Sequence, residues 1–194
     1  DQRNTIHFIT CRQEGGAANM AEAYGKLTGR PGVCVVTRGP GATNASVGLH
    51  TAFQDSTPMI LLVGQVGREM LDREAFQEVN HQIFFSEMSK WSAEIKDASR
   101  IPEYLSHAFH VALSGRPGPV VLSLPEDMLR DEAEVEDAPR AIPVQPAPTM
   151  EQMSEVREML KNAERPLMIL GGSGWSPEAC RFITHFAEKQ DLPV

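Results

Sequence analysis

Residues 33–44 read VCVVTRGPGATN, and this stretch decides the fold. Its apolar run at 33–37 lacks the alternation of polar and apolar residues typical of a half-buried strand, which predicts a strand covered on both faces. The glycines and proline at 39–41 predict a tight turn, after which the spacing of apolar residues becomes helical. A strand, a short turn and a helix in this order indicate an α/β unit with parallel strands.

The same alternation of short apolar runs and longer amphipathic segments extends to both sides of this stretch. The expected strands are Thr5–Ile9, Val33–Thr37, Met59–Val63 and Pro119–Leu124. The expected helices are Glu14–Leu27, Ala42–Gln54 and Arg100–Leu113. We therefore predict an α/β fold with a doubly wound, mostly parallel sheet that has helices on both faces.

The composition changes sharply after residue 125. Residues 126–137 contain seven acidic residues and one arginine, and residues 138–148 contain four prolines. An acidic run can form an anionic binding face, but it is more typical of a solvated linker. Prolines without helical or strand periodicity favour an extended connector.

We therefore divide the chain into three parts. A first α/β domain occupies residues 1–130, an acidic and proline-rich linker residues 131–149, and the start of a second α/β domain residues 150–194. In the last part we predict the helices Met150–Ala163 and Pro177–Gln190, with the strand Pro166–Leu170 between them. The chain starts without Met and stops within an apolar segment, so we expect the first domain to lack its opening elements and the second to be truncated.

The charge and the cysteine content restrict the function classes. With 18 basic and 26 acidic residues the net charge is −8, and no run of Lys and Arg is present to bind a phosphate backbone, so we expect no nucleic-acid partner. The longest apolar stretch, Met59–Val63, is much shorter than the ~20 residues that cross a bilayer, so we expect no membrane span. Cys11, Cys34 and Cys180 form no CxxC motif and indicate a reducing, cytoplasmic compartment.

A histidine pair is the only pattern in the sequence that suggests a metal. His107 and His110 lie three positions apart on a predicted helix and could therefore face the same ion. No third ligand accompanies them, so we predict ordinary helix packing for both and no metal site.

Candidate binding residues lie where expected strands lead into helices. Ligands of open α/β sheets bind at the carboxyl ends of the strands. Three junctions carry polar residues there: Glu14 before a run of small residues, Asn44 at the end of GPGATN, and Gln77 beside Phe76 in a long polar connection. Each also has a purely structural explanation, because an acid in the first turn of a helix interacts favourably with the helix dipole and glycine and proline suit any tight turn.

Taken together, the order and spacing of these segments resemble the pyrimidine-binding domain of thiamine diphosphate enzymes, particularly the acetolactate synthase-like branch. The matching stretches are RQEGGAANMAEAYGKLTG, VCVVTRGPGATN, DSTPMILLVGQV, EAFQE and SGRPGPVVLSLPEDM. They cover most of residues 9–130. The proline-rich connector and PLMILGGSG are similar to the passage into the central domain of that family.

The resemblance implies a role for each candidate residue. Glu14 matches the catalytic glutamate, which hydrogen-bonds the N1′ atom of the cofactor's aminopyrimidine and shares a proton with it. Pro40 and Asn44 would border the aminopyrimidine, and Gln77 would reach into the catalytic pocket. Phe76 would line the route of access.

Two basic residues have matching positions as well as structural alternatives. Arg116 matches a residue that contacts FAD in the flavin-containing members, and its alternative is a turn arginine paired with a nearby acid. Lys90 matches a lysine near the substrate channel, and its alternative is a solvated lysine.

The sequence departs from the family pattern at three positions near the candidate residues. Gly15 stands where many synthases have Gln, Asn19 where His is common, and Arg38 where a small residue precedes the glycine. Arg38 could bind a substrate carboxylate or an acyl-CoA phosphate, or it could merely cap the protein surface. The sequence has no adjacent His pair of the kind that the pyruvate decarboxylase branch carries, which favours carbon–carbon ligation over aldehyde release.

The activity that the resemblance implies is a thiamine diphosphate-dependent decarboxylation of a 2-oxo acid, followed by ligation to a second carbonyl compound. The alternatives are a decarboxylase or acyltransferase of the oxalyl-CoA or sulfoacetaldehyde type, or a non-catalytic paralogue. Mg2+ and the diphosphate would bind to a further domain, since no Gly-Asp dipeptide occurs in this sequence, and FAD is an additional candidate cofactor. We expect a homodimer or homotetramer, and no activity from these residues alone.

Overall fold

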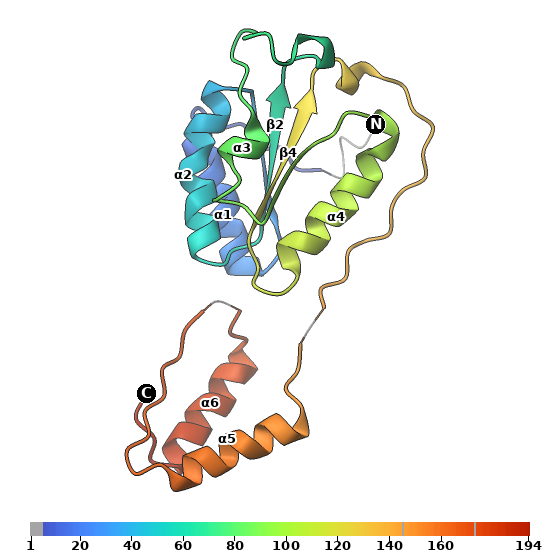
Figure 1. Cartoon of the computed structure of the whole chain (residues 1–194). Coiled ribbons are helices and arrows are strands. Elements are labelled where there is room, and N and C mark those ends of the chain that lie inside the picture. Colours follow the sequence, from blue (N-terminus) through green and yellow to red (C-terminus); the bar gives the residue numbers. More distant parts are fainter. Residues whose placement is uncertain (1–5, 145, 173) are drawn as a thin grey trace. The chain divides into compact units, whose positions relative to one another are not determined.

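The computed structural model describes residues 6–144, 146–172 and 174–194 (Figure 1). The chain forms two compact units, Asp1–Val144 and Gln145–Val194. The domain boundaries expected from the sequence stay predictions. Residues 131–144 and 146–149 form neither helix nor strand.

The first unit is built on a four-stranded, fully parallel sheet with the order β1-β2-β4-β3. Its strands are β1 Gly32–Val36, β2 Met59–Gln65, β3 Trp91–Glu94 and β4 Pro119–Pro125. Val36 is paired with Val63, and Val63 with Ser123, so the three longest strands end side by side. This confirms the predicted α/β fold with parallel strands.

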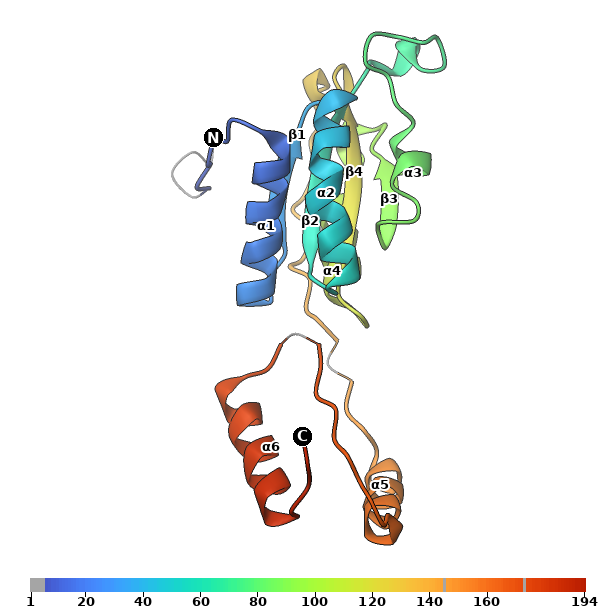
Figure 2. The ribbon, with the colours of Figure 1, turned by 90° about the vertical axis from the view of Figure 1, so that its left-hand side faces the viewer.

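Helices cover both faces of this sheet (Figures 1 and 2). The helices of the first unit are α1 Glu14–Thr28, α2 Pro40–Gln54, α3 His81–Phe84 and α4 Ile101–Leu113. Short 3-10 turns lie at Arg68–Met70, Ala98–Arg100 and Met128–Arg130. One apolar core joins α1 and α2 to the sheet through residues such as Leu49 and Leu61, and the other joins α4 through Ile60 and Val120.

Local chemistry explains where α1 and α2 begin and how closely they pack. The side chain of Gln13 accepts a hydrogen bond from the Gly16 N–H and so caps α1, while Pro40 starts α2 with a backbone angle already suited to a helix. The two helices approach closely at Gly48, where an added Cβ would lie 2.7 Å from the backbone of Ala18. The same contacts place the starts of both helices at the carboxyl edge of the sheet.

One sequence prediction for the first unit is wrong, and one strand of this unit was not predicted. Within the expected strand Thr5–Ile9, Thr5 lies outside the described residues and residues 6–9 form no strand. Ile6, Phe8 and Ile9 are exposed, and β1 pairs only with β2 among the described residues, so no ladder of hydrogen bonds holds this segment. Strand β3 was not predicted, because its four residues, WSAE, are too short and too polar to give a strand pattern.

The second unit contains α5 Met150–Asn162 and α6 Pro177–Lys189, as the sequence predicts to within one residue. Its expected strand Pro166–Leu170 is wrong. This segment is irregular, and one backbone hydrogen bond, from Met168 N–H to the Pro193 carbonyl, links it to the segment that follows α6. Leu167 and Ile169 remain exposed, because a strand forms only where a neighbour supplies a full ladder.

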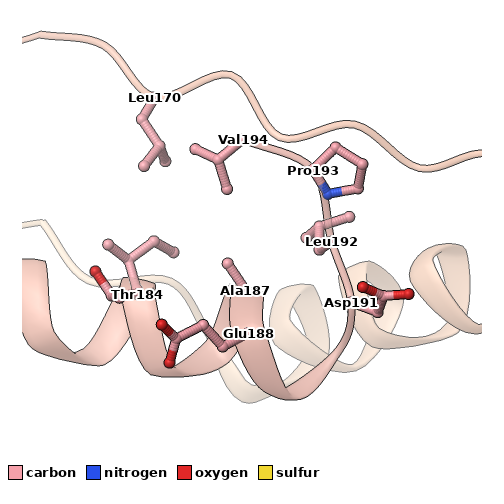
Figure 3. Close-up of a pocket in the computed structure, with 9 residues that line it drawn as sticks. Leu170, Thr184, Ala187, Glu188, Asp191, Leu192, Pro193 and Val194 are labelled. Carbon is pink, nitrogen blue, oxygen red and sulfur yellow. The ribbon is translucent and has the colours of Figure 1, made fainter.

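An apolar groove lies within the second unit (Figure 3). Its volume is about 450 Å³, and it is lined mainly by α6 and the segment after it, with Leu170 on the other side. Leu170, Val194 and Ala187 face into it. Across the described parts of the chain, no helix is both long enough and apolar enough to cross a membrane.

Candidate functional site

Glu14 and Asn44 meet at the carboxyl edge of the sheet. Glu14 is half-buried as the first residue of α1, and Asn44 lies one turn into α2. The Asn44 amide donates a hydrogen bond of 3.1 Å to Glu14 Oε2. The backbone beside them is close as well, since a Cβ on Gly15 would lie 3.1 Å from the Asn44 carbonyl oxygen. One oxygen of the carboxylate is thus fixed by a neutral amide.

The turn before α2 brings Gln77 to the same edge. Gly39 has φ 47° and ψ −103°, and a Cβ there would lie 2.7 Å from the carbonyl oxygen of Gln77. A side chain other than hydrogen is therefore excluded at this position. Pro40, the next residue, is exposed at the start of α2. At this edge Glu14 therefore contacts Asn44, and Gln77 lies against Gly39, the residue before Pro40.

The segment that carries Gln77 is tightly turned. Gln77 has φ 64°, and Asp72 and Glu74 also have positive φ values. The Glu78 carboxylate accepts hydrogen bonds from the backbone N–H groups of Asp72 (2.6 Å) and Ala75 (2.9 Å). These bonds stabilise the charged form and lower the pKa of Glu78. The adjacent Phe76 is 78% exposed, so it lies at the outside of the turn.

Arg38 lies at this edge and forms an ion pair. Its Nη1 donates a hydrogen bond of 2.9 Å to Glu126 Oε2, which links the end of β1 to the residue after β4. Its Nε is buried without a hydrogen-bond partner among the described residues. The ion pair gives Arg38 a structural partner near the surface, as the surface-capping interpretation expects. Contact with a substrate anion stays a hypothesis.

Arg116 and Lys90 lie at the opposite edge of the sheet. Arg116 donates to Ser56 Oγ (2.7 Å) and to the carbonyl oxygens of Phe53 and Gln54, so it caps the end of α2. Its expected acidic partner is absent among the described residues, and the contact with FAD stays a prediction. The Lys90 ammonium donates to two carbonyl oxygens at the end of α4, and burial lowers its pKa. The interpretation of Lys90 as a solvated lysine is therefore wrong.

The histidines of α4 lie outside this group of residues. The ring of His107 packs edge-on against Trp91 at 4.5 Å. Within residues 6–144, 146–172 and 174–194, no three His, Cys, Asp or Glu side chains come together as metal ligands.

Three buried polar residues near the Gln77 turn were not predicted from the sequence. Gln65 at the end of β2, His81 at the start of α3 and Ser123 in β4 are all almost fully buried. His81 Nδ1 lies 3.0 Å from Ser123 Oγ. The only signal in the sequence is a serine within the apolar run of β4, and it does not indicate which residues surround it.

The comparisons with known proteins agree with this geometry. Residues 1–84 match the family model described as thiamine pyrophosphate enzyme, N-terminal TPP binding domain. These residues belong to the N-terminal domain of a thiamine diphosphate enzyme. The chain is 35% identical to an acetolactate synthase of Arthrospira platensis. The alignment of 206 residues covers 100% of this chain and 34% of that protein.

Two further relatives are of the same kind. A glyoxylate carboligase of Escherichia coli O157:H7 is 38% identical over 97% of this chain and 32% of its own length. The acetolactate synthase large subunit of Lactococcus lactis is 36% identical over 97% of this chain and 34% of its own length. The chain thus spans about a third of the length of these relatives. The resemblance to the acetolactate synthase-like branch is confirmed.

Proposed function

We propose that this chain binds the aminopyrimidine of thiamine diphosphate in an enzyme that decarboxylates a 2-oxo acid and ligates the product to a second carbonyl compound. The contact between Glu14 and Asn44, next to the turn formed by Gly39 and Gln77, carries this proposal. Relatives named acetolactate synthase and glyoxylate carboligase support the ligation step.

The residues at the carboxyl edge fit the cofactor. Among the described residues Glu14 accepts a hydrogen bond at one oxygen alone, so the other can face a ring nitrogen. Gly16 offers an exposed backbone beside it, where a Cβ would have only the Gln13 side chain within 4 Å. A flat, partly polar ring requires an open surface of this kind with a carboxylate at its rim.

Each residue then has a defined task. Glu14 holds a proton at its carboxylate and shares it with the ring nitrogen, while Asn44 orients the carboxylate. Pro40 borders the ring, and Gln77 lies toward the reacting carbon. Bound thiamine diphosphate would supply the nucleophilic carbon and the electron sink for the loss of CO2.

Further parts of the proposal concern the whole protein. We propose that Mg2+ and the diphosphate bind outside these 194 residues and that the enzyme is a homodimer or homotetramer. FAD remains a candidate cofactor, with Arg116 as its predicted contact. Three free cysteines, one buried and one half-buried, support a reducing cytoplasmic location.

The test measures acetolactate and CO2 from the complete protein with thiamine diphosphate, Mg2+ and pyruvate. Glu14→Gln should lower turnover by at least about 100-fold, because the glutamine cannot share a proton with the ring nitrogen. Glu103→Gln is the matched control, since Glu103 is also an acid in the first turn of a helix but lies on α4. It should keep normal turnover.

Each other outcome points to a different function. CO2 without acetolactate would move the assignment to a decarboxylase. If pyruvate does not react, a panel of 2-oxo acids and acyl-CoA compounds is tested next, and failure of the whole panel would favour a non-catalytic paralogue. Normal turnover in the Glu14→Gln variant would contradict the proposed function.

A further inference from the structure

A buried polar cluster contacts the segment that follows Gln77. We call Gln65, His81 and Ser123 the buried cluster; their exposed fractions are 2%, 2% and 0%. They come from β2, α3 and β4, and none of them has a task in the proposed function. Polar side chains are rarely placed in an apolar core without a hydrogen-bonding purpose.

The cluster ties one limb of the Gln77 segment to three strands. The Gln65 amide donates a hydrogen bond of 2.9 Å to the carbonyl oxygen of Val79, two residues after Gln77. His81 Nδ1 lies 3.0 Å from Ser123 Oγ of β4. From β3, the hydroxyl of Ser92 donates to the carbonyl oxygen of His81 at 3.2 Å. The return limb of the turn is therefore fixed at Val79 and His81.

Gln77 itself needs this support. Its φ of 64° lies in the left-handed region, which is strained for a residue other than glycine. Such a conformation persists only when neighbouring structure enforces it. Gly39 restrains Gln77 from one side, and Glu78 holds the limb that precedes it. The buried cluster holds the limb that follows.

At a purely structural position, an apolar side chain would stabilise the fold better than the imidazole of His81. Burial lowers its pKa to about 4, so the imidazole is neutral near pH 7 and pairs with the serine hydroxyl without a buried charge. Its Nε2 atom is buried and has no hydrogen-bond partner among the described residues. A leucine would avoid that unsatisfied group, since a buried polar atom without a partner destabilises the folded state.

We propose that Gln65, His81 and Ser123 are positioning residues that hold the Gln77 side chain at the reacting side of the cofactor. This inference rests on the proposed function. The cluster does not touch the reacting atoms; it acts through the backbone of Val79 and His81.

The test compares kcat and KM for the 2-oxo acid in variants of the complete protein. His81→Leu and Ser123→Ala should each lower kcat by about tenfold and leave KM for the 2-oxo acid and the affinity for thiamine diphosphate within about twofold, because small misplacement of a reacting group affects the chemical step most. His81→Asn should recover much of kcat, since its side-chain amide can replace Nδ1 as the partner of Ser123.

A double-mutant cycle separates positioning from general stability. In a Gln77→Ala background, His81→Leu should change kcat by less than about twofold, because the side chain that the cluster positions is gone. Ser89→Ala is the control: Ser89 is also buried, but its hydroxyl donates to the carbonyl oxygen of Phe85 and not to the Gln77 segment. It should leave kcat unchanged.

The outcomes distinguish this inference from the proposed function. Equal losses from His81→Leu in the presence and absence of Gln77, or a Ser89→Ala variant as impaired as Ser123→Ala, would overturn the positioning role alone. If Glu14→Gln retains full turnover in the same preparations, the proposed function fails, whatever the cluster variants do.

Discussion

The two edges of the parallel sheet use polar side chains in opposite ways. At the amino edge, Lys90 and Arg116 donate hydrogen bonds to the last carbonyl oxygens of α4 and α2. At the carboxyl edge, Glu14 contacts a neutral amide, and Gln77 lies against Gly39. Lys90 and Arg116 at the amino edge are thus hydrogen-bonded to helix ends, whereas Glu14 at the carboxyl edge can still accept a hydrogen bond from a ligand.

The direction of the chain explains this difference. Each helix that follows a strand runs back across the sheet, so helices begin at the carboxyl edge and end at the amino edge. Helix ends carry carbonyl groups without partners, which attract Lys and Arg. A basic residue near a helix end therefore has a structural use that its sequence pattern does not reveal. Substitutions at the two edges should have correspondingly different effects.

The largest difference is expected between two glycines. Gly39→Ala would place a Cβ 2.7 Å from the Gln77 carbonyl oxygen at φ 47°, so the Gln77 turn must move. We expect kcat of the complete protein to fall by about 100-fold, with a loss of roughly 1–3 kcal/mol in unfolding free energy. Both are measured on the same preparation, by steady-state kinetics and by urea unfolding.

Gly115→Ala is the matched control at the amino edge. Gly115 has φ 60°, but no atom lies within 4 Å of an added Cβ. The variant should lose about 1 kcal/mol of unfolding free energy through backbone strain and keep its kcat. Equal losses of kcat in both variants would contradict the difference between the edges.

Most of the carboxyl edge could be predicted from the sequence, because its residues lie at element boundaries. Glu14 and Pro40 stand where helical spacing starts, and the turn residues at 39–41 locate the edge itself. These signals are local in the chain. The contact between Glu14 and Asn44 depends in addition on the close packing of α1 against α2 at Gly15 and Gly48.

The rest depends on contacts between distant parts of the chain. Gln65 and Ser123 meet His81 only after three elements are assembled, and nothing in their own neighbourhood distinguishes them from surface residues. The segment 166–170 has a strand-like composition but no paired neighbour. Apolar periodicity reports burial preference, whereas strand formation also requires a partner.

Acid is expected to affect stability alone, through a residue near the carboxyl edge. Burial lowers the pKa of His81 from 6.5 to about 4. As pH falls through 6.5 the unfolded chain binds a proton there and the folded chain does not, so unfolding free energy decreases until pH 4, below which both states are protonated. The decrease should reach about 2–3 kcal/mol.

Urea unfolding between pH 7 and pH 4 measures this slope. The His81→Phe variant should lose that part of the pH dependence, because no group at position 81 then titrates. His110→Phe should keep it, since His110 is exposed on α4. An unchanged slope in His81→Phe would show that His81 is not the group responsible.

The smallest effect is expected at the amino edge, where Arg116 caps α2. Arg116→Ala removes hydrogen bonds to two terminal carbonyl oxygens and to Ser56, together with a contact of 5.8 Å between the guanidinium and the ring of Phe53. Because the side chain is exposed, unfolding free energy should fall by only about 0.5–1 kcal/mol. Arg116→Lys should recover part of it, because an ammonium still interacts with the helix end. An unchanged unfolding free energy in Arg116→Ala would show that the cap contributes nothing. The flavin absorbance of the purified variant reports separately on Arg116, because its loss would show that the same side chain also contacts FAD.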